Sequence, residues 1–210
     1  MKENGYEYVD LGLPSGTMWA TWNVGASKPE DEGLLFQFGH ADGYLYNDKH
    51  NQFKTGDIAL TTSGKIYKEN EILDLADDAA HVNMGGAWKM PTKDELEELV
   101  NNTTQEVETI NGVKGMLFAS NINKRQLFIP FMQGYWYNGT WYSLNKACTD
   151  IWASQVRVSS TVYAYRIYCS SANGVYVNNF FYRSAAFSVR GVFKSNDTSN
   201  EHTNNINMLI

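Results

Sequence analysis

Residues 151–193 contain no Lys, Asp or Glu, although they carry four Arg and a high density of aromatic side chains. Within this segment, residues 163–168 and 175–177 alternate in the manner of β-strands, and Asn173-Gly174 between them is a turn signal. We therefore predict an antiparallel hairpin. Because only one face of a strand is expected to join the core, we expect several of these side chains to be exposed. Period two assigns Tyr163, Tyr165 and Ile167 to one face and Ala164, Arg166 and Tyr168 to the other.

The composition of this segment is typical of a binding surface. Rigid Tyr and Phe rings supply contact area in such surfaces, while Arg, Ser, Asn and Gly supply adaptable hydrogen bonds. We expect the affinity to concentrate at Tyr165, Arg166, Tyr176, Phe181 and Tyr182. The full set of predicted ligand-binding residues is Arg157, Ser159, Ser160, Tyr163, Tyr165, Arg166, Tyr168, Tyr176, Asn178, Asn179, Phe180, Phe181, Tyr182, Ser184 and Ala185.

The genetic code offers a second constraint. When both adenines of an Asn codon are scrambled, Tyr, Ser, Arg, Phe, Val and Cys become accessible, whereas Lys, Glu, Gln, Met and Trp do not. None of these five inaccessible types occurs in residues 157–185, as expected from adenine-directed mutagenesis of an Asn-rich template. The same absence fits a Tyr- and Val-rich β-region, because strands disfavour some of the missing types. Composition alone leaves both interpretations open.

Four separated blocks carry a family resemblance. They are YVDLGLPSGTMWATWNVGA at residues 8–26, NMGGAWKMPTKDE at 83–95, FIP at 128–130 and AFSVR at 186–190. In this order they resemble the opening, the central GGxWRMPTxxE block, the short core strand and the closing GFSVRPV of the Fibrobacter succinogenes major paralogous domain. The resemblance covers residues 6–193. The chain departs from the family at Ala186 and Gly191, where Gly and Pro are usual.

The resemblance implies an α+β, C-type-lectin-like fold, with short helices packed on twisted antiparallel sheets and much irregular structure. In many members a retroelement diversifies a C-terminal variable region, and WAS at residues 152–154 resembles the YWSS that often opens it. The variable region would then span 151–193. The implied function is non-enzymatic recognition of a protein or glycan on a target cell surface. A non-diversifying adhesin or glycan-binding module of the same fold is the alternative, and an enzyme related to formylglycine-generating enzymes is a third hypothesis.

No cofactor or metal is expected. The EPN and WND motifs of calcium-dependent lectins are absent from the sequence. The Gly-rich loop at residues 40–50 holds His40, Asp42, Asp48 and His50, but their spacing matches neither an EF-hand nor a zinc pattern. We expect Cys148 and Cys169 to be free thiols, and their spacing does not match the active-site pair of formylglycine-generating enzymes.

We expect one domain at residues 6–193, preceded by an N-terminal extension at 1–5 and followed by a polar tail at 194–210. A capping box at Thr92 and Glu95 predicts a helix, and Asn111-Gly112 and Asn138-Gly139 predict hairpin turns. The six Trp are assigned mainly to the core. The remaining expected elements are strands at 8–11, 18–22 and 127–131, a helix at 74–82 and an irregular segment at 30–56.

The 210 residues carry a net charge of −6, which argues against nucleic acid as a partner, although the local Arg excess keeps single-stranded nucleic acid as a minor alternative. No apolar stretch approaches the roughly 18 residues of a membrane span, so we expect no membrane insertion. The first five residues are polar and lead directly into domain sequence, so we expect no signal peptide in this chain. We expect a location on a virion surface or a bacterial cell surface. Exposure of residues 180–182 would favour a homo-oligomer.

Overall fold

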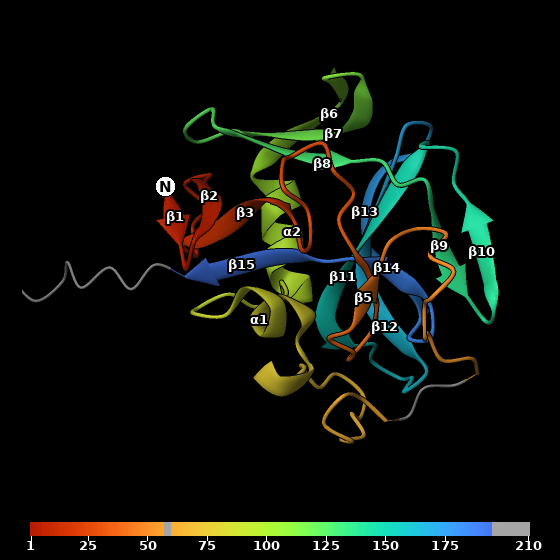
Figure 1. The fold of residues 1–210 in the computed structure, drawn as a ribbon. Helices are drawn as coiled ribbons and strands as arrows, with labels where there is room; N and C mark the ends of the chain where they lie inside the picture. Colours follow the sequence, from red (N-terminus) through yellow and green to blue (C-terminus); the bar gives the residue numbers. More distant parts are fainter. Residues whose placement is uncertain (57–59, 195–210) are drawn as a thin grey trace, which may run out of the picture.

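The computed structural model describes residues 1–56 and 60–194 (Figure 1). Within these ranges the fold is mainly β, and a few short helices pack against antiparallel sheets. The expected combination of short helices and antiparallel strands is therefore present, with strands dominating. None of the described helices has the length and apolarity needed to cross a bilayer. Nearly all of the expected polar tail, residues 195–210, lies outside the described residues.

The N-terminal sheet contains both ends of the described chain. Its strand order is β1 (Lys2–Glu3), β2 (Tyr6–Asp10), β3 (Thr17–Asn23) and β15 (Arg190–Lys194). The expected strands at 8–11 and 18–22 are thus confirmed. The expectation of an N-terminal extension is wrong, because residues 1–5 form β1 and a turn, and the carbonyl oxygen of Glu3 accepts a hydrogen bond of 2.9 Å from Nε1 of Trp88.

The central sheet carries the predicted variable region. Its main order is β10 (Thr140–Ser143), β9 (Gly134–Tyr137), β14 (Ala186–Ser188), β11 (Cys148–Val156), β12 (Tyr163–Ser170) and β13 (Gly174–Tyr182). β14 also pairs with β4 (Leu35–Gln37), which in turn pairs with β5 (Gly43–Tyr44). The segment 30–56 is therefore less irregular than expected. Local composition does not reveal β4, because its partner β14 lies far along the chain.

A third sheet consists of β6 (Thr103–Ile110), β7 (Val113–Ser120) and β8 (Gln126–Pro130). Both predicted Asn-Gly turns are confirmed: Asn111-Gly112 joins β6 to β7, and Asn138-Gly139 joins β9 to β10. All four residues have positive φ, which is the conformation required by the tight turns of hairpins. The buried strand expected at 127–131 corresponds to β8.

The helices begin where the sequence supplies caps. The helix α2 (Lys93–Asn101) starts after Thr92, whose Oγ1 accepts from the backbone N–H of Glu95 at 3.2 Å, while Oε2 of Glu95 accepts from the N–H of Thr92 at 2.8 Å. The helix expected at 74–82 is split into a 3-10 turn, η1 (Leu75–Asp77), and α1 (Ala79–Met84). Asp78 between them is extended and caps α1 by accepting from the N–H of His81.

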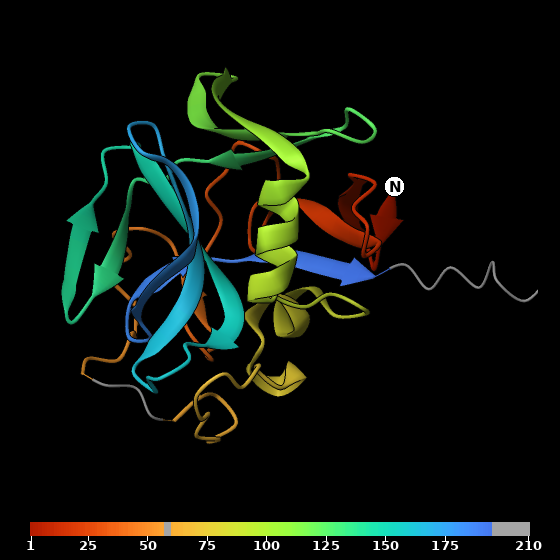
Figure 2. The ribbon, with the colours of Figure 1, turned by 180° about the vertical axis from the view of Figure 1, so that it is seen from behind.

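Hydrophobic clusters cover both faces of β11 and β12. Trp152, Ala164 and Phe187 belong to one cluster, whereas Tyr165 and Ile167 belong to the other, which also contains Leu96 and Leu99 of α2. Figure 2 shows α2 between the β12–β13 hairpin and the N-terminal sheet. The expectation that only one face of β12 is buried is therefore wrong. Four Trp are buried, as expected of core residues: Trp19, Trp88, Trp136 and Trp152. Trp22 and Trp141 are half-buried.

Candidate functional site

The β12–β13 hairpin positions most of the predicted binding residues. The register pairs Tyr163 with Tyr182 and Tyr165 with Phe180 on one face, and Ala164 with Phe181 on the other. After a bulge beyond Arg166, Tyr168 pairs with Tyr176. Because paired residues project from the same face of a sheet, the predicted set is divided between two faces.

A continuous chain of aromatic rings nevertheless connects these faces. We call this chain, together with Tyr168 and Tyr176, the aromatic surface. Tyr137 joins the two faces, because its ring stacks on Tyr182 and also contacts Phe181 edge-on. The successive ring-centroid distances are 5.2 Å for Tyr142–Tyr135, 5.8 Å for Tyr135–Phe181, 5.7 Å for Phe181–Tyr137, 5.3 Å for Tyr137–Tyr182, 4.7 Å for Tyr182–Tyr163 and 5.3 Å for Tyr163–Phe180.

The rings are half-buried or exposed, so each keeps part of its surface accessible to a ligand. A hydrogen bond with Tyr182 raises the pKa of Tyr163, and burial raises the pKa of Tyr135. Both phenols are therefore neutral at physiological pH and act as hydrogen-bonding groups. Neighbouring rings restrict one another, which lowers the entropy lost when a ligand binds.

The predicted binding set omits the rings of the β9–β10 hairpin. Tyr135, Tyr137 and Tyr142 lie outside residues 151–193, yet they complete the ring chain. The signal in the sequence was the Asn138-Gly139 turn with aromatic residues on both sides. What the sequence does not show is that rings of β9 contact rings of β13, although β14, β11 and β12 lie between these two strands in the strand order.

Arg166 lies beneath the aromatic surface. Only 9% of the residue is exposed, and its Nη1 contacts Oδ1 of Asp150, which is itself buried. Its guanidinium carbon lies 4.9 Å from the ring centre of Phe181 and 5.5 Å from that of Tyr168. Burial lowers the pKa of Arg166 to about 10, so the side chain remains charged at neutral pH. It thus links the pair Tyr168–Tyr176 to the rest of the ring chain.

Four predicted ligand-binding residues are buried, and the prediction that they are displayed is wrong. Tyr165 belongs to the cluster that includes α2, and Arg166 is held by Asp150. Ser184 and Ala185 are buried in the turn that leads from β13 into β14. Tyr165 packs with α2, and the carbonyl oxygen of Ser184 accepts a hydrogen bond from Nε2 of Gln37, so strand alternation could not identify the burial of these residues.

The loop between β11 and β12 presents three further predicted residues, Arg157, Ser159 and Ser160. The guanidinium carbon of half-exposed Arg157 lies 3.7 Å from the ring centre of Phe180 and extends the ring chain at that end. Ser159 is exposed at a φ of 65°, and its N–H donates to Oε2 of Glu69 at 3.0 Å. Ser160 is half-exposed, as is Asn179 in β13. The side chain of Asn178 lies outside the described residues.

Two other Arg of the segment belong to the interior. Arg190 is fully buried, and its guanidinium donates to Oδ1 of Asn23 and to the carbonyl oxygens of Ala20 and Phe128 at 2.8, 3.0 and 3.1 Å. Arg183 is 2% exposed and donates to the carbonyl oxygen of Thr161. The Arg excess noted in the sequence is therefore mostly structural.

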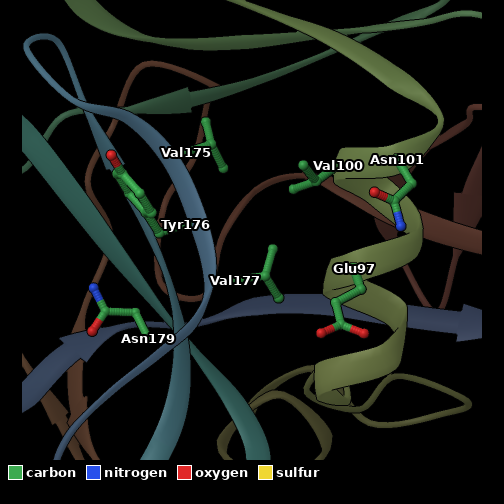
Figure 3. A pocket seen from close by; sticks show the side chains of 7 residues that line it. All are labelled: Glu97, Val100, Asn101, Val175, Tyr176, Val177 and Asn179. Carbon is green, nitrogen blue, oxygen red and sulfur yellow. The ribbon is translucent and has the colours of Figure 1, made fainter.

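A groove of about 470 Å³ lies between α2 and β13, next to the aromatic surface. Figure 3 shows Val100 and Glu97 of α2 extending toward Val175 and Val177 of β13. Asn101, Tyr176 and Asn179 complete the lining. Of these residues, only Tyr176 and Asn179 belong to the predicted binding set. The predicted binding set contains no residue of α2.

The described residues contain no group of three or more His, Cys, Asp or Glu side chains that converge as metal ligands. Cys148 and Cys169 are buried and unpaired. The register explains why: Cys169 pairs with Thr149, so the neighbouring Cys148 projects from the opposite face of the sheet. In addition, burial strongly raises the pKa of Cys169, which keeps this thiol protonated.

Comparisons with family models, with curated proteins and with solved structures return no match to this chain.

Proposed function

We propose that this protein is a non-enzymatic ligand-binding protein whose C-terminal variable region, together with the β9–β10 hairpin, forms a recognition surface on a C-type-lectin-like scaffold. The observation that carries the proposal is the continuous chain of rings from Tyr142 to Phe180, flanked by Arg157. Aromatic rings and Arg dominate the energetics of recognition surfaces. Their ligand would be a protein or glycan on a target cell, and the protein would be displayed on a virion or bacterial surface.

Two properties of the site support recognition in preference to catalysis. The rings pack against one another, and the Arg166–Asp150 pair lies beneath them, so the surface is ordered before a ligand binds. The buried thiols do not form the reactive pair that the formylglycine-generating alternative needs. A non-diversifying adhesin of the same fold would use the same surface. The genomic DNA distinguishes the diversified protein from the non-diversifying adhesin. Only the diversified protein requires, beside a reverse transcriptase gene, a near-copy of the codons for residues 151–193 that differs from them only at adenines.

Binding of the fluorescently labelled full chain to bacterial cells and to a glycan array would test the proposal. Tyr176→Ser and Tyr182→Ser should each weaken binding about 30-fold, since hot-spot residues contribute about 2 kcal/mol or more. The matched control is Ile122→Ser, because Ile122 is 53% exposed and Tyr176 is 51% exposed. Equal binding by all three variants, or loss only on changes in the loop at residues 40–50, would disprove the assignment of this surface.

A further inference from the structure

The strand β13 has a free outer edge. It is the last strand in the order of the central sheet, and among residues 1–56 and 60–194 no strand pairs with its outer side. Beyond its ladder to β12, the carbonyl oxygen of Tyr182 accepts from the N–H of Ala185, and the N–H of Phe180 donates to Oδ1 of Asn179. A strand of nine residues with an unpaired edge is a template for the addition of another strand.

The groove beside this edge gives the added strand a place for its side chains. Val100 of α2 and Val175 and Val177 of β13 form apolar walls, and Glu97 and Asn101 add polar groups on the helix side (Figure 3). Side chains of an extended chain project alternately to two sides. One set of alternate side chains of an added strand would therefore enter the groove, and the other set would face the side of Tyr176 and Asn179.

The negative charge of α2 indicates which kind of side chain the groove would bind. Oε1 of Glu97 lies 2.6 Å from Nζ of Lys93, and the Glu97 side chain is 35% exposed, so a ligand can reach its carboxylate. Lys93 offsets one of the carboxylates of Asp94, Glu95, Glu97 and Glu98, so α2 remains net negative, and the chain as a whole carries −6. A basic side chain is favoured here, whereas a second copy of this acidic chain would bring like charges together.

We propose that β13 and α2 bind an extended peptide segment that contains a Lys or Arg, and that this segment adds as a strand to the outer edge of β13. Backbone hydrogen bonds to β13 supply affinity, and the groove supplies selectivity for an apolar side chain next to a basic one. The groove is lined by Tyr176 of the aromatic surface but by no member of the ring chain from Tyr142 to Phe180, so Glu97→Gln and Val177→Asp test this site, whereas Tyr182→Ser tests the proposed function.

The test is a selection from a displayed library of random linear nine-residue peptides against the full chain. The enriched peptides are then synthesised, and their affinities are measured by fluorescence anisotropy. We expect alternating apolar sequences with one Lys or Arg. Their binding should slow amide hydrogen exchange in residues 174–182, and N-methylation of alternate peptide amides should abolish binding.

Variants of groove residues distinguish the contribution of charge to peptide affinity from the contribution of shape. Glu97→Gln should weaken the Lys peptides about two- to fivefold, as expected for a half-exposed ion pair, and should leave their Lys→norleucine analogues unaffected. Val177→Asp should weaken both peptide types more than tenfold, with its folding checked by thermal melting. Glu106→Gln on β6, where the carboxylate is exposed, is the matched control and should change nothing. Absence of enrichment, protection elsewhere than in β13, preference for acidic peptides, or self-association of the chain through β13 would each overturn the proposal.

Discussion

Arg157 and Arg166 belong to the same predicted binding segment, yet their environments are opposite. Arg157 is half-exposed and stacks on Phe180, whereas Arg166 is buried and paired with Asp150. Removal of one member of a buried ion pair is strongly destabilising, because the other ion then stays desolvated without its partner at a cost of several kcal/mol. Arg166 is thus part of the support beneath the aromatic surface, and Arg157 is part of the surface itself.

We predict that Arg166→Ala destabilises the fold by about 3 to 5 kcal/mol, because it leaves the carboxylate of Asp150 buried without its partner. Arg157→Ala should cost no more than about 1 kcal/mol, the scale of an exposed cation–π contact. Urea unfolding of both variants measures the difference. The double variant Arg166→Met with Asp150→Leu should recover much of the loss. Equal stability of Arg166→Ala and the unmodified protein would contradict the role of the pair.

The burial of His40 predicts that the folding stability of the protein depends on pH. Burial lowers its pKa to about 4, with a further contribution from Lys54, and its Nε2 has no hydrogen bond among the described residues. The unfolded state, with an ordinary pKa near 6.5, therefore binds more protons between about pH 6.5 and 4, so folding stability falls as the pH is lowered through this range. His40→Gln should lose less stability than the unmodified chain between pH 7 and 5 in urea unfolding. Parallel curves for the two proteins would show that His40 is not protected from protonation.

At the scale of elements, the β9–β10 hairpin belongs to the central sheet and also contributes rings to the aromatic surface. Gly134 pairs with Ser143 at the base of the hairpin. A Cβ at Gly134 would lie 2.1 Å from the carbonyl oxygen of Tyr142 and 2.3 Å from the ring of Tyr46. Because one of these neighbours is backbone, the hairpin must move to accommodate any side chain.

Gly134→Ala should therefore cost about 1 to 3 kcal/mol, the range for overpacking, and should displace the rings of Tyr135 and Tyr142. Near-UV circular dichroism reports the ring displacement, and thermal melting reports the loss of stability. Gly112→Ala in the β6–β7 turn is the control, since its Cβ would meet no atom within 4 Å. It should cost about 1 kcal/mol from its positive φ alone and leave the ring signals unchanged. Identical spectra for the two variants would argue against the tight packing at Gly134.

At the scale of the whole molecule, sequence signals predict local structure well and long-range pairing poorly. The capping box of α2 and the Asn-Gly turns are set by neighbouring residues, so they follow from sequence alone. Strand alternation also identifies the β12–β13 hairpin, but exposure depends on what covers each face. α2 covers one face of β12, and Phe187 and the β9–β10 hairpin cover the other. For this reason Tyr165 and Arg166 are buried, contrary to the prediction, while Tyr135 was not recognised.

A chelator should leave the whole molecule unchanged. Since no metal-ligand group converges among the described residues, addition of EDTA should alter neither the melting temperature nor ligand binding. Differential scanning fluorimetry with and without EDTA measures this, and added Ca²⁺ serves as the converse control. A fall of several degrees on chelation would point to an ion held near Asp42 and Asp48.

The position of β15 has a consequence for how the protein is made. β15 pairs with β3, and Val192 exchanges backbone hydrogen bonds of 2.9 and 2.8 Å with Lys89, so the last described strand closes the N-terminal sheet. A ribosome that stops early, or shifts frame within residues 157–185, releases a chain without this strand and without β14. Such a chain leaves the apolar faces of β3 and β11 uncovered and is a substrate for proteases. A chain that is not translated in frame through residues 157–185 therefore cannot complete either the N-terminal sheet or the central sheet.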